Sequence, residues 1–299
     1  MKTKEKKSAL LPGLITVLMV VAAVAGGIRM TDPDGEQLDT MRQELEAITA
    51  ENEGLTAQVA ALRAETAEQK ALPEAIQKQK DEGFRLLGEL ERQIRAGESD
   101  KKIAYLTFDD GPYDNTTDAI LDILKEKGVR ATFFLRHRPD HVAQIQREIR
   151  EGHTLANHSY SHKIKAVYQS ADSCIKEIRD QQKWLTETVG VTPEIYRFPG
   201  GSATAGNKKQ TIAAALAADG LGYVDWNCAT GDGLPGVLTT EKAYQNAISS
   251  VGEQKIVVML MHDYSAATLE ALPDIIDTLE AKGYMMMPLF RESVMIRSA

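Results

Sequence analysis

Cysteine is scarce in this chain of 299 residues, which contains Cys174 and Cys228 and no others. Two cysteines on separate predicted elements do not define a disulfide framework, and neither has the spacing of a metal-binding motif. We interpret both as free thiols, although a pair stays open for an exported protein. Basic residues are outnumbered too, since 35 Lys and Arg face 43 Asp and Glu and the net charge is −8. That balance gives no support for nucleic-acid binding, which usually shows a basic footprint.

Charged residues are missing from one long stretch, residues 8–28. It is about as long as a bilayer-spanning helix. The lysines that precede it place the N-terminus in the cytoplasm and the rest of the chain outside. A cleaved signal peptide ending at Ala23-Val24-Ala25 is the alternative. We favour a retained anchor over residues 1–30, because the apolar run is long for a signal peptide and continues past that site. The chain is then expected to be a single-pass protein of the cell membrane whose bulk is extracellular.

Residues 31–98 are dominated by good helix formers, and a heptad seam runs through them. The seam positions, spaced alternately three and four apart, are Leu38, Met41, Leu45, Ile48, Asn52, Leu55, Val59 and Leu62. A lone Asn52 among the a positions favours a parallel, two-stranded coiled coil. We expect Pro73 to interrupt this stalk, and a second amphipathic segment follows it. The pattern predicts a homodimer, whereas a solitary helix packed against the third region is the alternative.

In the third region, residues 99–299, short β-rich runs alternate with amphipathic helical stretches. The predicted strands are Ile103–Phe108, Ala131–Leu135, Thr154–Ala156, Ile195–Phe198, Gly222–Asn227, Ile256–Met261 and Tyr284–Met287. Such alternation predicts an α/β fold with a mainly parallel sheet and helices outside it. The region is shorter than the about 250 residues that an eightfold barrel usually needs, so we predict a distorted (β/α)7-type barrel.

Polar residues with catalytic chemistry follow several predicted strands. Asp109 and Asp110 end the first one, before a Gly-Pro turn, and His158 and His162 follow the third. One aspartate and two imidazoles form a plausible donor set for a divalent metal, which leaves the second aspartate for proton transfer. A spacing of four residues predicts that both histidines share one face of a helical turn. At the carboxyl ends of barrel strands, where catalysis resides, we expect Asp109, Asp110, Arg197 and His262.

Five short segments complete the pattern in a fixed order. They are Thr107–Pro112 (TFDDGP), His158–His162 (HSYSH), Arg197–Gly201 (RFPGG), Trp226–Asp232 and Leu260–His262 (LMH). Together they resemble the motifs of the polysaccharide deacetylase family, the NodB homology domain or carbohydrate esterase family 4. The likeness covers residues 101–289 and leaves out the anchor and the stalk. It implies a distorted barrel of about seven strands, in agreement with the strand pattern.

The resemblance also assigns roles to individual residues. Asp110, His158 and His162 would bind a divalent metal, usually zinc, with cobalt as an alternative. Asp109 would be the general base and His262 the general acid. The other residues that it implicates are Arg197 and Asp232, which would orient and tune the base, and Pro199, Gly200, Trp226 and Leu260, which would contact the substrate.

The substrate contacts depart in part from the family pattern. Gly200 stands where many members carry a larger side chain, so it has no side chain to contact the sugar. Its backbone N–H would help to hold an oxyanion. Trp226 and Leu260 would enclose the acetyl methyl group, although Trp226 could belong to the core. The fourth motif lacks the final Trp of many members, and Asp225 competes with Asp232 for the place of its aspartate. We favour Asp232.

The resemblance therefore implies a metal-dependent hydrolase that removes acetyl groups from N-acetylglucosamine in a cell-surface polysaccharide, with peptidoglycan as the first choice. Chitin-like oligosaccharides, N-acetylmuramic acid and acetylxylan are alternative substrates. A non-catalytic, glycan-binding scaffold dimerised by its stalk is an alternative of another class, and the full set of candidate acids, bases and metal ligands argues against it.

Overall fold

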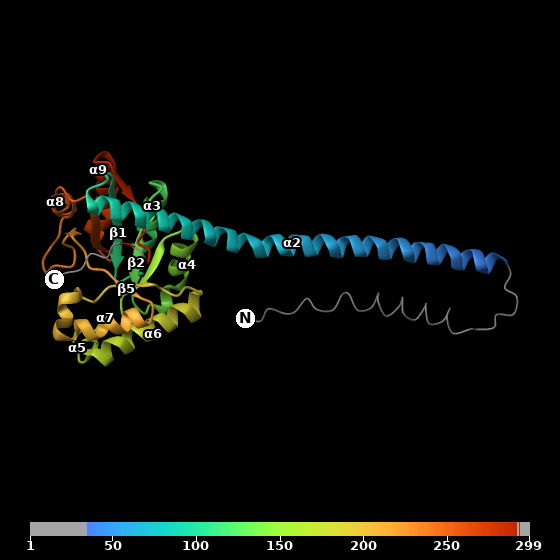
Figure 1. Cartoon of the computed structure of the whole chain (residues 1–299), viewed down its shortest axis with the longest axis horizontal. Coiled ribbons are helices and arrows are strands. Elements are labelled where there is room, and N and C mark those ends of the chain that lie inside the picture. The colour runs from blue at the N-terminus through green and yellow to red at the C-terminus, as the bar shows by residue number, and fades with distance from the viewer. Residues whose placement is uncertain (1–34, 292, 294–299) are drawn as a thin grey trace. The chain divides into compact units, whose positions relative to one another are not determined.

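The computed structural model describes residues 35–291 and 293 (Figure 1). The predicted membrane anchor, residues 8–28, lies outside this part of the chain. Across the described residues, no helix combines the length and the apolar character that crossing a bilayer requires. The chain divides into two compact units, Met1–Gln77 and Lys78–Ala299.

Helix α2 spans Gly35–Ala96, which is 62 residues. The break that we expected at Pro73 is wrong, because the helix continues through that position. A proline removes one backbone hydrogen bond and crowds the preceding turn, and a long helix can absorb this without ending. Leu45 and Leu55 of the heptad seam are 57% and 41% exposed. Pairing of two such seams in a coiled coil stays a prediction.

The second unit is built on an eight-stranded sheet. Its strands are β1 (Lys102–Asp109), β2 (Thr132–Leu135), β3 (Thr154–Asn157), β4 (Ile195–Tyr196), β5 (Gly222–Tyr223), β6 (Cys228–Ala229), β7 (Ile256–His262) and β8 (Tyr284–Met286). They lie in the order β5-β4-β3-β2-β1-β7-β6, with β8 beside the start of β1, and their pairings are parallel. The predicted α/β class is therefore confirmed.

The helices lie around the sheet (Figure 1). They are α3 (Thr117–Glu126), α4 (Val142–Arg150), α5 (Ile164–Val167), α6 (Ala171–Val189), α7 (Lys209–Ala218), α8 (Thr240–Val251) and α9 (Ala266–Ala281), with 3-10 turns at Pro139–His141 and Ser202–Lys208. Side-chain caps start three of them, since Ser170, Thr239 and Ser265 each accept a hydrogen bond from the backbone N–H three residues on. These caps satisfy amides that have no partner within the helix.

The predicted distorted barrel is confirmed in its parallel, curled sheet, and over the described part of the chain the sheet does not close. Strands β5 and β6 are the two edges, and no pairing joins them among the described residues. The predicted strand Gly222–Asn227 ends early because the chain crosses from one edge to the other. Val224 N donates to Tyr196 O on one side, whereas Asn227 N donates to Val258 O on the other. The fold is therefore an open half-barrel.

Alternate side chains of β1 enter two different cores. Leu106 and Phe108 pack with residues of α3, α4, α8 and α9. Ile103 and Tyr105 point to the other face, where Leu87 and Ile94 from the end of α2 cover them. The Tyr105 hydroxyl donates a hydrogen bond to Glu91, which is fully buried. The end of α2 thus belongs to this core, whereas we had assigned residues up to 98 to the stalk.

Candidate active site at the carboxyl ends of the strands

Parallel pairing brings the candidate acids and bases to one edge of the sheet. β1 ends at Asp109 and β7 ends at His262, and these two residues are register partners. β3 ends at Asn157, so His158 follows directly, and Arg197 follows the last residue of β4. Residues 153 apart in sequence become neighbours because their strands run side by side in the same direction.

The predicted metal ligands do come together. Asp110, His158 and His162 each offer one ligand atom, and these atoms lie within 4.8 Å of one another. Asp110 Oδ1 is 3.4 Å from His162 Nε2 and 4.0 Å from His158 Nε2. That oxygen is buried and has no hydrogen-bond partner. A buried, unsatisfied carboxylate oxygen facing two imidazole nitrogens fits a divalent ion such as zinc, which takes N and O donors.

The two histidines lie in a turn after β3, so the helical turn that we predicted from their spacing is wrong. Ser159 and His162 have positive φ angles of 70° and 55°, which a helix does not contain. Side chains hold this backbone in place: Ser159 N donates to Asn157 Oδ1 (2.9 Å), and His162 N donates to Ser159 Oγ (3.1 Å). Local polar side chains have thus replaced the helical hydrogen bonds.

Contacts from other elements fix the same turn. Glu177 of α6 accepts from Ser161 N at 2.6 Å and from Ser161 Oγ at 2.8 Å. The ring of His137, which follows β2, stacks on Tyr160 with centroids 4.1 Å apart. His158 Nδ1 lies 2.9 Å from the carbonyl oxygen of Arg197. Because a carbonyl only accepts, Nδ1 carries the proton and Nε2 keeps a free lone pair for a metal.

Electrostatics at this position favour the forms that bind metals. Burial and the neighbouring His158 lower the pKa of His162 to about 4, so its imidazole is neutral at pH 7. Burial alone raises the pKa of Asp110, but His158, His162 and Arg136 outweigh it and the net pKa is lowered. An anionic carboxylate and a neutral imidazole are the protonation states that ligate a divalent ion.

The candidate base, Asp109, is almost fully buried and paired. Its Oδ1 accepts from Arg197 Nη1 at 2.7 Å, and the two side chains are 3% and 0% exposed. The same Nη1 donates to Thr107 Oγ1 at 2.7 Å, and the guanidinium lies 4.0 Å from the centre of the Phe134 ring. Arg197 therefore contacts the base as the resemblance implied. Asp109 Oδ2 faces the donor set, 3.5 Å from His158 Nε2.

The candidate acid, His262, is oriented by Asp232, and here our prediction needs correction. We expected Asp232 to tune the base together with Arg197. Its Oδ1 instead lies 2.8 Å from His262 Nδ1, and its Oδ2 accepts from His262 N (2.8 Å) and Thr268 Oγ1 (2.6 Å). Asp232 follows β6, which pairs in parallel with β7 and places Ala229 opposite Leu260, so Asp232 and His262 leave the same edge of the sheet side by side. Burial lowers the pKa of His262, but the hydrogen bond to Asp232 and the charges of Asp109 and Asp232 raise it overall.

The competing aspartate, Asp225, has a different place. Its carboxylate accepts from Ser202 N at 2.8 Å and from Ser202 Oγ at 2.6 Å. It thereby holds the loop that follows β4, and its backbone oxygen accepts from Arg197 Nη2 at 3.1 Å. Of the two aspartates, Asp232 is the one that contacts His262.

The residues predicted to contact substrate line the loop after β4 and its neighbours. Gly200 is exposed with φ 73°, and Gly201 has φ 84°. A Cβ on Gly201 would lie 3.1 Å from the Trp226 ring, so Trp226 packs closely over this loop. Pro199 is buried, and Leu260, in β7, is 9% exposed. Contacts of these four residues with a sugar stay predictions.

Sequence reasoning missed Asp263, which directly follows His262. It is fully buried, and its Oδ2 accepts from Thr117 Oγ1 at 2.6 Å. Burial raises the pKa of its carboxyl to about 7. Any side chain on Gly111 would collide with this carboxyl, so the turn after Asp110 packs directly on it. The sequence signal that could have found it is an aspartate directly after the Leu260–His262 motif.

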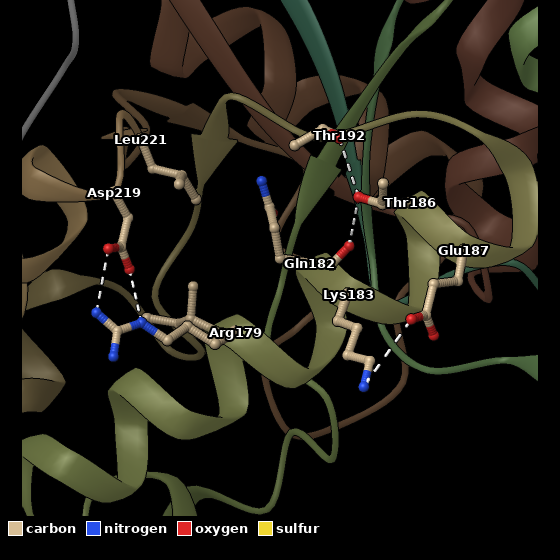
Figure 2. Close-up of a pocket in the computed structure, with 9 residues that line it drawn as sticks. Arg179, Gln182, Lys183, Thr186, Glu187, Thr192, Asp219 and Leu221 are labelled. Carbon is tan, nitrogen blue, oxygen red and sulfur yellow. Dashed lines mark hydrogen bonds and ion pairs between the residues drawn. The ribbon is translucent and has the colours of Figure 1, made fainter.

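A separate cavity of about 580 Å3 lies at the opposite edge of the sheet (Figure 2). Its charged residues come from α6 and from the segment before β5, and they already pair with one another. Arg179 Nε is 2.7 Å from Asp219 Oδ2, and Lys183 Nζ is 3.9 Å from Glu187 Oε1. No free charge converges on this cavity from its four charged residues, so it does not compete with the site at the carboxyl ends.

An acid–base pair beside an Asp-His-His donor set, at the catalytic edge of a parallel α/β sheet, defines a hydrolase site. The family model of polysaccharide deacetylases matches residues 96–222. The chain is 30% identical over 203 residues to a peptidoglycan-N-acetylglucosamine deacetylase of Bacillus cereus, covering 65% of this chain and 71% of that protein. It is 35% identical over 196 residues to YheN of Bacillus subtilis, of which it spans 65%.

Solved structures agree with these sequence matches. The catalytic domain of peptidoglycan N-acetylglucosamine deacetylase from Eubacterium rectale superposes with a TM-score of 0.63 at 36% identity, covering 66% of this chain and 93% of that one. A carbohydrate esterase of family 4 from Streptococcus mutans gives a TM-score of 0.61 at 31% identity, with 68% and 91% covered. The chain therefore belongs to the polysaccharide deacetylase family. Its homologues are hydrolases that act on the C–N bonds of N-acetyl groups.

Proposed function

We propose that this protein removes the acetyl group from N-acetylglucosamine residues of peptidoglycan in a metal-dependent hydrolysis that releases acetate. The observation that carries the proposal is the position of Asp109 and His262. They are register partners on β1 and β7, and the Asp110-His158-His162 donor set lies beside them. The names of the Bacillus cereus and Eubacterium rectale relatives support this choice of polymer and sugar.

The side chains divide the proton transfers between them. A zinc ion held by the donor set would polarise the acetamide carbonyl and lower the pKa of water at the site. Asp109, whose side chain pairs with Arg197, accepts the proton of the attacking water. His262 donates its proton to the leaving amine nitrogen. Because Asp232 accepts the Nδ1 proton, Nε2 is the nitrogen that His262 presents to the substrate.

The predicted anchor and stalk give the proposal a location. An uncharged segment of bilayer-spanning length behind cytoplasmic lysines would tether the chain to the cell membrane, with the catalytic unit outside, next to its polymer. We also propose that two stalks pair through the heptad seam, on which Leu45 and Leu55 are exposed in a single chain. Analytical ultracentrifugation of residues 31–299 tests this, and a monomer alone at micromolar concentration would exclude the dimer.

The activity test uses residues 31–299 loaded with zinc, with acetate release measured on peptidoglycan and on N-acetylglucosamine oligomers. We expect release that a chelator abolishes and zinc or cobalt restores. Asp109→Asn should bind zinc and fold but lose at least about a hundredfold in rate, as expected for a missing general base. Acetate release that persists in this variant would contradict the assigned base, and a metal-loaded wild type that releases no acetate would favour a non-catalytic scaffold.

A further inference from the structure

Two arginines stand beside the candidate metal ligands in the segment that follows β2. Asp109 in β1 is the register partner of Phe134 in β2, so the residues just past the end of β2 reach the catalytic edge of the sheet. Arg136 and Arg138 are both partly buried there. The reaction steps assigned above use neither of them.

The carboxylate partner of Arg136 is Asp110, which is also a candidate metal ligand. Its Nε lies 3.6 Å from Asp110 Oδ1, and its side chain is 23% exposed. The same oxygen is the candidate metal ligand. A carboxylate oxygen that binds a divalent cation has less negative charge to offer a guanidinium, so Arg136 then favours another anion nearby.

Arg138 has no anionic partner among the residues that the structure describes. Its guanidinium lies 4.2 Å from the centre of the Tyr113 ring, and its Nη2 is 3.5 Å from the backbone oxygen of Asp110. Its Nε is buried and has no hydrogen-bond partner. Within the described part of the chain, no carboxylate lies within 4.0 Å of Arg138. A partly buried guanidinium normally pairs with a carboxylate, so the guanidinium of Arg138 can donate hydrogen bonds to a carboxylate of a ligand.

A row of aromatic rings connects this arginine to the candidate acid. Tyr113 contacts Tyr264 edge to face with centroids 5.5 Å apart, and Tyr264 lies 5.0 Å from the ring of His262. Tyr264 is 38% exposed. The row therefore offers an apolar surface that a sugar chain can follow, from the nitrogen where the amine leaves to the free guanidinium of Arg138.

We propose that Arg138, with Arg136 beside it, binds a carboxylate of the substrate polymer on the sugar next to the one that is deacetylated. This inference rests on the proposed function and narrows it to acidic glycans. In peptidoglycan strands whose stem peptides have been removed, every N-acetylglucosamine neighbours a muramic acid whose lactyl ether ends in a free carboxyl group, whereas chitin has no such group. A guanidinium recognises a carboxylate through two parallel hydrogen bonds, a geometry that a neutral sugar cannot match.

The test compares two substrates that differ at the lactyl carboxyl, which is charged in one and esterified in the other. One is a peptide-free tetrasaccharide of alternating N-acetylglucosamine and N-acetylmuramic acid, and the other is its methyl ester at the lactyl carboxyls. The measured quantity is the ratio of kcat/KM for acid over ester, from acetate release by the zinc-loaded chain. We expect a ratio of about ten or more in the wild type and a ratio near one in Arg138→Gln, as for the loss of one charge-assisted hydrogen bond.

Two further variants control the comparison. Arg179→Gln removes a guanidinium at the opposite edge of the sheet and should keep the wild-type ratio. Arg138→Lys keeps the positive charge but loses the two parallel N–H donors of the guanidinium, and it should give an intermediate ratio of kcat/KM for acid over ester. Thermal unfolding and zinc content of each variant show whether it has folded. A ratio near one in the wild type, or an unchanged ratio in folded Arg138→Gln, would overturn the inference.

Product acetate is the other carboxylate that could reach Arg138. If Arg138→Gln weakens inhibition by acetate but leaves the acid-to-ester ratio unchanged, the guanidinium serves the product and the inference is wrong. Acetate release without any preference would leave the proposed function intact and remove this inference alone. If neither substrate releases acetate, the proposed function fails, and calorimetric binding of acid against ester to the zinc-loaded chain still decides the carboxylate question.

Discussion

Replacing Asp232 by Asn should change how the activity depends on pH. Asp232 accepts the Nδ1 proton of His262 at 2.8 Å, and its side chain is 2% exposed, so the interaction is shielded from water. Burial by itself lowers the pKa of His262, and the hydrogen bond and carboxylate charges raise it. Asn keeps the shape and removes the charge. The loss of a charge-assisted hydrogen bond costs about 2 kcal/mol, which corresponds to about thirtyfold in a rate that depends on that bond.

The direction follows from the role of His262 as an acid. Activity needs the imidazolium, which is present below its pKa and lost as pH rises through it. Since Asp232→Asn lowers that pKa, the alkaline limb of the pH profile should move to lower pH. We expect kcat/KM to fall about thirtyfold at pH 8, and the gap to the wild type should shrink as the pH is lowered, because more of the imidazole is then protonated in both proteins.

The assay is acetate release by zinc-loaded protein from pH 5 to 9, with Asp225→Asn as the matched control. Asp225 bonds to Ser202 and not to His262, so its replacement should leave the alkaline limb in place. A limb that moves in Asp225→Asn and stays in Asp232→Asn would refute this reasoning. A uniform loss at every pH in Asp232→Asn would point to misfolding, which circular dichroism detects.

Three further outcomes follow from other contacts. Burial lowers the pKa of His153 to about 4 from an ordinary value of 6.5, so His153 should contribute about 3 kcal/mol to the loss of folding stability between pH 6.5 and 4. In urea titrations, His153→Gln should remove this contribution and leave that of His162 in place. Leu87→Ala should destabilise the catalytic unit by about 2–4 kcal/mol, whereas Leu86→Ala, at a side chain 55% exposed, should change it by under about 0.5 kcal/mol. Glu177→Ala should weaken zinc affinity about tenfold by calorimetry, because it frees the turn that carries the histidines.

The long strands and their catalytic ends could be predicted from the sequence. β1 and β7 are continuous apolar runs that are buried on both faces, and this is the pattern of central parallel strands. β6 was missed because a strand of two residues, Cys228 and Ala229, has no periodicity to detect. The crossing between β5 and β6 depends on backbone hydrogen bonds to two distant strands, which no local pattern encodes.

The site shows the same division between local and long-range information. The grouping of one aspartate with His158 and His162 followed from residue type and order, and the choice of Asp110 came from the family resemblance. The turn that holds the histidines could not be predicted from the sequence, because a spacing of four residues is equally compatible with a helix. Glu177 and His137, which belong to other elements, stabilise this turn. The partner of Asp232 was predicted wrongly because the sequence does not show which of two strand ends a loop will face.

The end of helix α2 determines where a recombinant fragment of the catalytic unit should begin. A fragment that begins at residue 99 keeps every motif but loses Leu87, Glu91 and Ile94, so one face of its sheet would be open to water and the Tyr105 hydroxyl would lose its acceptor. Recombinant versions designed from the motifs alone would therefore be prone to aggregate for reasons unrelated to catalysis. Starting at Lys78 retains the last turns of the helix and should give a well-behaved enzyme for crystallisation.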